Sequence, residues 1–294
     1  MTADNSVKCA VVIPCYKVSN NILTVIDSIG SEVEKIYIVD DACPENSGDL
    51  VKNKSLDNRI SIIYNSRNLG VGASTKKGFH EAFKKNDIDV CIKIDGDGQM
   101  DTQNIKRFLE PFKKKSYLYV KGNRFHFHRN FLKMPFIRML GNFLLSFVSK
   151  ITTGQYNIFD VTNGFIAMHK NVYKKINQSN ISDDYFFETS MVAEMRKIKC
   201  KILDIKIETI YNNEKSNLVI NKILFHFITR HISTFVTRII NEYIKLKDYL
   251  MIFLIFGIFV TLIISIFITN KIIILISLIF LFFLKDKSFN IIEE

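Results

Sequence analysis

Two aspartates and a glutamine make up the segment of this sequence best suited to chemistry. Asp95, Asp97 and Gln99 alternate with glycines directly after the apolar run 90–94. Carboxylates at positions i and i+2 of a tight turn can both face one hard cation, and oxygen ligands favour Mg²⁺ or Mn²⁺. Such a cation would neutralise charge that develops on a diphosphate leaving group. The alternative is a polar turn that only ends a strand, and the motif alone leaves both interpretations open.

Polar residues also follow two other apolar runs. Pro14 and Tyr16 end the run that starts near residue 8, and Asp40 and Asp41 end the run 35–39. An acidic side chain at a strand end can accept hydrogen bonds from a base or a ribose. A solvated strand terminus explains the two aspartates equally well.

The glycine-rich segment 68–78 lacks the spacing of a known phosphate loop. Thr75 stands where a Walker A motif needs Gly followed by Lys, and where Gly-x-Gly-x-x-Gly needs its third glycine. The segment therefore predicts a turn that opens a helix and packs closely.

Strand-like and helix-like segments alternate through the first 121 residues and would position these side chains. The strand-like runs are continuous and apolar, which is typical of strands covered on both faces. This alternation predicts a mostly parallel α/β sheet, in which ligands bind at the carboxyl ends of the strands. The expected strands are 8–13, 35–39, 60–64, 90–94 and 117–121, and the expected helices are 19–30, 46–54, 72–86 and 102–115.

A less regular region follows, from about 124 to 212. It starts with a basic aromatic loop, 124–133, that suits a phosphate-bearing lipid headgroup at a membrane surface better than His126 and His128 suit a metal. The remaining expected elements are a helix at 136–150, a turn-rich segment at 157–165, a helix near 185–199 and a strand at 201–208.

The C-terminal third is apolar in a different way. Residues 216–248 place isoleucine, leucine and phenylalanine at helical spacing among lysines and arginines, which favours interfacial membrane helices over helices packed on the globular domain. Residues 249–269 carry no charge and would span about 31 Å as a helix, enough for a bilayer core. The run 272–284 is shorter, and lysines flank the apolar region on both sides. This pattern predicts a hairpin with both ends cytoplasmic.

Composition narrows the class of protein. The chain has 294 residues, 48% of them hydrophobic, with 12 Gly and 4 Pro, which excludes disordered and collagen-like chains. The net charge of +11 suits anionic partners such as diphosphates and acidic lipids. The five cysteines form no Cys-x-x-Cys pair and predict reduced thiols, and no signal peptide is expected in the polar first residues.

Taken in chain order, these segments resemble family 2 glycosyltransferases of the GT-A fold. The similarity is greatest to the polyprenyl-phosphate glycosyltransferase branch, which includes dolichol-phosphate mannose synthase. It covers about residues 10–218 and rests on VVIPCYK (11–17), YIVDDACPENSG (37–48), NSRNLGVGAS (65–74), KIDGDGQMD (93–101), KGNRF (121–125), FDVTNGF (159–165) and FFETSM (186–191), with a looser match at YNNEKSNL (211–218).

The resemblance implies which residues bind the donor, a GDP- or UDP-sugar. Pro14, Tyr16 and Asp41 would line the nucleotide pocket, with Asp41 facing the base. The residues implied to bind Mg²⁺ or Mn²⁺ and the donor diphosphate are Asp95, Asp97 and Gln99.

The resemblance also implies which residues lie at the acceptor, undecaprenyl or dolichyl phosphate. Arg124 and Arg138 would contact its phosphate, and Asp160 and Glu188 would lie near the acceptor site. Lys215 is the basic residue of the looser terminal motif, displaced by one position.

A polyprenyl phosphate is already ionised at neutral pH, so its oxygen attacks the anomeric carbon without a strong base. The enzyme would then position the reactants and stabilise the leaving group, and a single displacement would invert the anomeric centre. If the acceptor were instead a hydroxyl of a lipid-linked or cell-surface glycan, a base would be needed, and Asp183, Asp184 and Glu188 are candidates. A catalytically silent membrane protein that binds nucleotide sugar is a third hypothesis.

The sequence thus predicts four parts: a GT-A domain (1–215), amphipathic juxtamembrane helices (216–248), a transmembrane hairpin (249–284) and a cytoplasmic tail (285–294). We expect an integral protein of the cell membrane with its catalytic domain in the cytoplasm. The expected partners are the donor, the acceptor and the bilayer, without nucleic acid, since the basic residues are spread out. The hydrophobic helices leave a homo-oligomer open.

Overall fold

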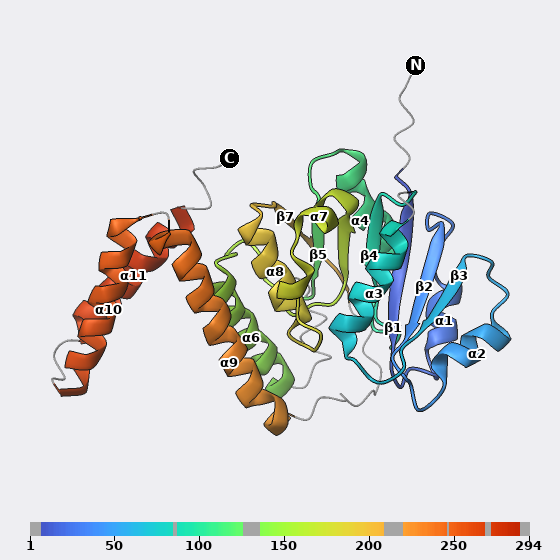
Figure 1. The fold of residues 1–294 in the computed structure, drawn as a ribbon, viewed down its shortest axis with the longest axis horizontal. Helices are drawn as coiled ribbons and strands as arrows, with labels where there is room; N and C mark the ends of the chain where they lie inside the picture. Colours follow the sequence, from blue (N-terminus) through green and yellow to red (C-terminus); the bar gives the residue numbers. More distant parts are fainter. Residues whose placement is uncertain are drawn as a thin grey trace, which may run out of the picture.

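The computed structural model describes residues 7–84, 87–125, 136–208, 220–245, 247–267 and 272–288. Its centre is a seven-stranded sheet with the strand order β3-β2-β1-β4-β6-β5-β7, drawn in Figure 1. The strands are β1 (Cys9–Cys15), β2 (Lys35–Asp40), β3 (Ile60–Tyr64), β4 (Val90–Lys93), β5 (Tyr119–Asn123), β6 (Ile166–His169) and β7 (Ile202–Lys206).

The predicted parallel α/β sheet is confirmed, with one departure. β3, β2, β1 and β4 pair in parallel, as do β5 and β7. β6 was not expected, and it runs antiparallel between β4 and β5. Since it consists of only four residues, IAMH, it gives no long apolar run in the sequence.

Helices cover both faces of the sheet because its strands are apolar on both sides. Alternate residues of β1 illustrate this: Val11 packs into a core with α1 and α4, whereas Val12 packs into a second core with α3. The helices are α1 (Ile22–Asp27), α2 (Ser47–Lys54), α3 (Val71–Lys84), α4 (Asn104–Lys113), α6 (Phe136–Thr153), α7 (Lys170–Lys175), α8 (Phe187–Lys197), α9 (Ile220–Ile239), α10 (Tyr249–Phe267) and α11 (Ile272–Ser288).

All five cysteines are unpaired, as predicted. Four of them lie buried in or beside the sheet, and Cys200 is half-buried. Burial raises the pKa of Cys200 to about 11, so its thiol stays protonated at neutral pH.

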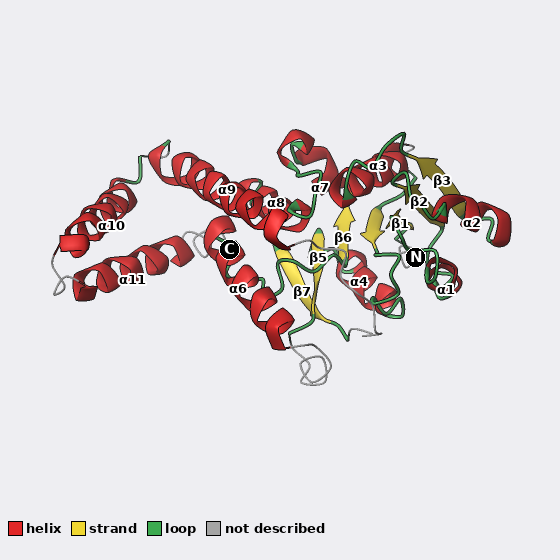
Figure 2. Ribbon diagram, turned by 90° about the horizontal axis from the view of Figure 1, so that it is seen from below, coloured by secondary structure: helices red, strands yellow, loops and turns green. Residues whose placement is uncertain are grey.

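The C-terminal helices extend to one side of the sheet domain. α9 lies along α6, and α10 and α11 pack against each other farther out (Figures 1 and 2). α9 continues into a π-helical turn, Ile240–Ile244, and exposes an apolar stripe with a spacing of four residues. Over the described residues, no helix combines the length and the apolarity that crossing a membrane requires.

Four charged side chains, three of them buried and Glu242 partly exposed, join this helical part to the sheet domain, and we call them the hairpin ion cluster: Arg196, Arg238, Glu242 and Asp286. Arg196 belongs to α8, Arg238 to α9, Glu242 to the π-helical turn and Asp286 to the end of α11. Arg196 binds both oxygens of Glu242, at 2.7 and 2.8 Å, and Arg238 binds Asp286 at 2.7 Å. The first turn of α10 and the last turn of α11 therefore lie at the same end of the hairpin, against the sheet domain.

Candidate active site

The topology brings the predicted site residues that follow the strands to one edge of the sheet. The carboxyl ends of β1, β2 and β4 share this edge because the three strands are parallel. β5 runs in the same direction because antiparallel β6 separates it from β4. The loop before β6, which holds Asp160, and the residue after β5, Arg124, therefore meet at the edge where Asp95 and Asp97 follow β4.

Local hydrogen bonds fix the conformation of the turn that carries the two aspartates. The Asn21 side chain donates to the backbone oxygen of Asp97 at 2.9 Å, and the backbone N–H of Gln99 donates to Asp97 Oδ1 at 3.0 Å. Gly98 has a φ of +77°, a conformation that glycine adopts without strain. Asp95, Asp97 and Gln99 remain half-exposed at the open edge.

This donor set fits a hard divalent cation. It consists of two carboxylates and an amide, all offering oxygen, which is the chemistry that Mg²⁺ and Mn²⁺ prefer. In the described ranges, no group of three or more His, Cys, Asp or Glu side chains is close enough to hold a metal by itself. A cation here would therefore need further oxygen ligands from water or from a bound diphosphate.

A buried lysine that sequence reasoning missed lies directly behind Asp95. Lys93 has 1% of its side chain exposed, and its Nζ lies 2.7 Å from Asp95 Oδ1 and 3.1 Å from Glu188 Oε1. Burial alone would lower the pKa of Lys93, but the Asp95 and Glu188 carboxylates outweigh it and raise this pKa. A lysine inside the otherwise apolar strand VCIK was the signal that would have pointed to it.

Arg124 is held by Asp160 in a two-pronged ion pair. Its Nε lies 2.7 Å from Asp160 Oδ2 and its Nη2 lies 2.9 Å from Oδ1. Asp160 is fully buried, whereas 18% of the Arg124 side chain is exposed. Burial would raise the pKa of Asp160, but the adjacent guanidinium outweighs this effect and lowers it. Asp160 therefore binds Arg124 from inside the protein, and its place near the acceptor stays a prediction.

Asp41, one of the residues predicted to line the nucleotide pocket, has a buried side chain that binds its own loop. Its side chain accepts hydrogen bonds from the Asn65 amide and from the backbone N–H groups of Leu69 and Gly70, at 2.7 to 2.8 Å. Only 3% of Asp41 is exposed, so in this structure it fixes the 65–70 loop and does not face an open pocket. Tyr16, 36% exposed at the end of β1, is the open side chain here, and Pro14 is buried in β1.

The glycines of segment 68–78 serve close packing, as their spacing predicts. A Cβ on Gly72 would lie 2.2 Å from the backbone oxygen of Ser182, in the loop before α8. The start of α3 therefore needs glycine here to pack against that loop. The loop leads to Tyr185, which is 46% exposed. Burial and the nearby Asp95 carboxylate raise the pKa of Tyr185, an open aromatic side chain that sequence reasoning missed.

The aspartates considered as general bases are engaged elsewhere. Asp184 accepts from the backbone N–H of Phe186 and from the Ser182 hydroxyl, both at 2.8 Å, and pairs with His226 at 2.9 Å. Although burial opposes it, these hydrogen bonds lower the pKa of Asp184, which makes it a weak base. Asp183 pairs with Lys76 at 2.5 Å on the surface.

Part of the predicted acceptor side falls outside the described residues. These are Lys215 and residues 126–133 of the basic aromatic loop, and for Arg138, in α6, only the backbone is described.

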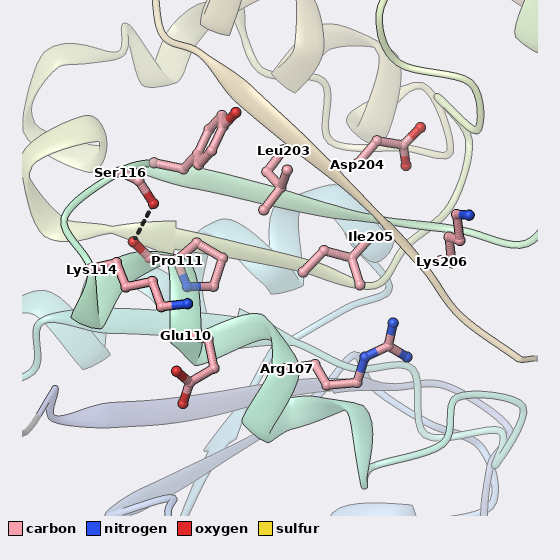
Figure 3. Close-up of a pocket in the computed structure, with 10 residues that line it drawn as sticks. Arg107, Glu110, Pro111, Lys114, Ser116, Leu203, Asp204, Ile205 and Lys206 are labelled. Atoms are coloured by element: carbon pink, nitrogen blue, oxygen red, sulfur yellow. Dashed lines mark hydrogen bonds between the residues drawn. The ribbon is translucent and has the colours of Figure 1, made fainter.

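A separate hollow of about 420 Å³ lies between α4 and the edge strand β7 (Figure 3). The Ser116 hydroxyl donates to the Pro111 carbonyl at 3.2 Å along its wall. Of the predicted site residues that the structure describes, none lines this hollow. It is therefore a surface feature apart from the sheet edge that carries Asp95 and Asp97.

With the geometry of this edge established, similarity to known proteins decides the family. The family model described as glycosyl transferase family 2 matches residues 10–177, more than half of the chain. The chain belongs to this family. Its GT-A-like α/β fold and its glycosyltransferase activity, both predicted from the ordered motifs, are thereby confirmed, whereas the transmembrane hairpin stays a prediction.

Two archaeal relatives of this family 2 glycosyltransferase match along most of their length. The UDP-N-acetylglucosamine–dolichyl-phosphate N-acetylglucosaminyltransferase of Methanococcus voltae is 26% identical over 214 residues, 68% of this chain and 84% of that protein. An uncharacterised protein of Methanocaldococcus jannaschii is 25% identical over 228 residues, 76% of this chain and 91% of that protein.

A solved structure supports the GT-A fold. Glucosyl-3-phosphoglycerate synthase from Mycobacterium tuberculosis, in complex with Mn²⁺, UDP-glucose and glycerol 3-phosphate, matches with a TM-score of 0.58. The match covers 79% of each chain at 12% sequence identity, so the likeness concerns the fold alone.

Proposed function

We propose that this protein is a membrane-anchored, inverting glycosyltransferase that moves a sugar from a nucleotide sugar to a polyprenyl phosphate. The observation that carries the proposal is the shared sheet edge, which holds both the Asp95–Gln99 turn and the Arg124 guanidinium, whose position is fixed by the buried Asp160 carboxylate. The dolichyl-phosphate transferase of Methanococcus voltae supports a lipid-phosphate acceptor.

The donor lies over β1, β2 and β4 in this proposal. Tyr16 and Pro14 flank the nucleotide, and Asp41 shapes the pocket by holding the 65–70 loop. Asp95, Asp97 and Gln99 hold a Mg²⁺ or Mn²⁺ ion, which when bound supplies positive charge for the departing nucleoside diphosphate.

The acceptor phosphate lies against Arg124. An arginine whose one edge is held by Asp160 has lost most of its rotational freedom before the ligand arrives, so less entropy is lost on binding. An ionised phosphate oxygen needs no general base, which agrees with Glu188 being tied to Lys93 and Asp184 being tied to the start of α8. We place Arg138 and Lys215 on the same anionic group.

The membrane part of the proposal rests on apolar surface. The exposed stripe of α9 (Ile228, Ile232 and Val236) and of the π-helical turn after it (Ile240 and Ile244) suits the interface of a bilayer, with the catalytic domain on the cytoplasmic side. Residues 249–284 follow it with a single charge, Lys271. We propose that they form the membrane hairpin, with both ends at the sheet domain.

A transfer assay tests the proposal. Detergent-solubilised full-length protein is incubated with Mg²⁺ or Mn²⁺, polyprenyl phosphate and a panel of radiolabelled nucleotide sugars. Label in an organic-extractable, mild-acid-labile product is the expected result, and it names the donor. Label that appears only on an added glycan would contradict the lipid-phosphate acceptor.

The Asp97→Asn variant provides the catalytic control in the same assay. We expect transfer to fall at least about 100-fold, since one carboxylate of the proposed metal site loses its charge. The Asp57→Asn variant, which breaks an Asp–Arg pair remote from this edge, should keep full activity. Unchanged transfer by Asp97→Asn rules out the metal role.

A further inference from the structure

Lys93 is an unusual residue for its position. All four residues of β4 are buried, and the strand lies inside the sheet between β1 and β6. A charged side chain there costs free energy unless it is fully paired, so its partners show why it is present.

The two partners of Lys93 lie far from each other in the sequence. Asp95 lies two residues later in the turn proposed to bind the donor, and Glu188 lies 95 residues later in the first turn of α8. A second buried lysine, Lys121 in β5, donates instead to the backbone oxygen of Asn163. Of these two lysines, Lys93 is the one that binds a carboxylate of the turn.

The surrounding backbone is shaped around this pair. A Cβ on Gly164 would lie 2.4 Å from Lys93 Nζ and 2.7 Å from Asp95 Oδ2. A side chain at this point would displace the Lys93 ammonium or the Asp95 carboxylate from its present position. Lysine, aspartate and glycine therefore form one close-packed unit at the carboxyl end of β4.

We propose that Lys93 is a positioning residue for the donor site, on the basis of the proposed function of Asp95. Its ammonium holds Asp95 Oδ1 and anchors it to Glu188, so that the carboxylate presents Oδ2 in one fixed orientation. Partners that orient metal ligands typically change metal affinity 10- to 100-fold when they are replaced. Lys93 thus makes binding of the cation and the diphosphate depend on a residue that touches neither.

The test measures binding on the donor side alone. Full-length protein in detergent is titrated with Mn²⁺ in the presence of UDP or GDP, and free Mn²⁺ is followed by electron paramagnetic resonance. We expect Lys93→Met to weaken Mn²⁺ binding about tenfold or more. The matched control is Lys170→Met, which breaks a Lys–Asp pair at the opposite end of β4 and should bind Mn²⁺ normally.

A double variant separates positioning from stability. Lys93→Met leaves Asp95 and Glu188 without their shared cation, so the variant is expected to unfold at lower temperature. Adding Glu188→Gln removes one of the two charges and should restore much of the thermal stability without restoring Mn²⁺ binding. Glu188→Gln alone should weaken Mn²⁺ binding less than Lys93→Met does, because the Lys93–Asp95 contact remains.

Two results would overturn the inference. One is wild-type Mn²⁺ binding by Lys93→Met, and the other is recovery of stability and Mn²⁺ binding together in the double variant. Because no acceptor is present, an error in the proposed polyprenyl phosphate leaves this test intact. Wild-type protein that binds no Mn²⁺ with either nucleotide would overturn both the inference and the proposed metal site.

Discussion

At the sheet edge that carries Asp95 and Asp97, buried carboxylates fix the positions of neighbouring groups by hydrogen bonds. Asp160 is fully buried and holds Arg124 by two hydrogen bonds, and Asp41 holds three donors of the 65–70 loop. A charge in this setting sets geometry, because its neighbours lose hydrogen bonds if they move. Among the described residues, Tyr16, Tyr185, the half-exposed carboxylate turn and part of Arg124 have side-chain surface open to a ligand at this edge.

The Asp160→Asn variant tests the pairing with Arg124. We expect it to raise the KM for polyprenyl phosphate at least about tenfold and to reduce stability at pH 7 by about 2–4 kcal/mol, since a largely buried guanidinium loses its counter-charge. The matched control is Asp57→Asn, whose two-pronged pair with Arg59 is more exposed and remote from the edge. An unchanged KM would contradict the role of Asp160 in orienting Arg124.

The same pair has a defined pH dependence. The folded-state pKa of Asp160 is lowered below its ordinary value of 3.8, so the pair stabilises the protein fully above that value. The stabilisation is lost as the pH falls through the lowered folded-state pKa. The stability difference between wild type and Asp160→Asn, from denaturant unfolding, should therefore shrink only below about pH 4.

At the scale of elements, α8 connects two sets of buried charges. Its first turn carries Glu188, which meets Lys93, and its last turn carries Arg196, which belongs to the hairpin ion cluster. The loop before α8 packs on Gly72 and on α9 through the Asp184–His226 pair. The placement of α9 and the orientation of α8 therefore depend on the same contacts.

The pKa of His231 depends on the packing of α9 against α6 and the loop before α8. Its ring is 7% exposed, packs edge-on against Phe186 at 4.9 Å, and shares a hydrogen bond with Thr152 of α6 at 2.9 Å. Burial lowers the pKa of His231 to about 4, so the folded protein takes up its proton at lower pH than the unfolded chain. Stability is then full above about pH 6.5 and is lost progressively towards pH 4.

We expect the wild type to lose up to about 3 kcal/mol more than His231→Leu between pH 7 and pH 4, measured by denaturant unfolding in detergent. Leucine keeps the apolar contacts with Phe186 and cannot bind a proton. Parallel pH profiles for the two proteins would show that α9 does not bury a neutral histidine.

At the scale of the whole molecule, the hairpin ion cluster fixes the two C-terminal helices to the sheet domain. Asp286, fully buried, accepts from Arg238 at 2.7 Å, from Tyr156 at 2.5 Å and from Tyr243. Burial and the Asp286 carboxylate raise the pKa of Tyr243, so its hydroxyl remains a donor at all working pH values. Two arginines balance two carboxylates, and this balance makes the burial of Arg196, Arg238 and Asp286 tolerable.

The Asp286→Asn variant should disrupt this junction. Two buried arginines would then share one carboxylate, and we expect a loss of about 3–5 kcal/mol in thermal or denaturant unfolding. The control is the neighbouring Lys285→Gln, whose more exposed pair with Asp248 at 3.5 Å contributes about 0–1 kcal/mol. Equal losses in the two variants would show that the cluster does not anchor the hairpin.

The sequence by itself determined the parts of this protein that depend on neighbouring residues. Apolar runs such as 35–39 and 90–94 specify strands, and a polar residue after a run lies at a strand end, which placed Asp95 and Asp97 at the ligand-binding edge. The order of such motifs along the chain also gave the family, since each motif is contained within a few residues.

Only the tertiary structure decided how these parts pair. Lys93 and Glu188 are 95 residues apart, and Arg196 and Asp286 are 90 residues apart, so no local pattern relates them. The short antiparallel β6 and the burial of Asp160 likewise depend on what packs beside them. Periodicity records whether a side chain is apolar or polar, whereas the partner of a buried charge is set by segments that meet only when the chain is folded.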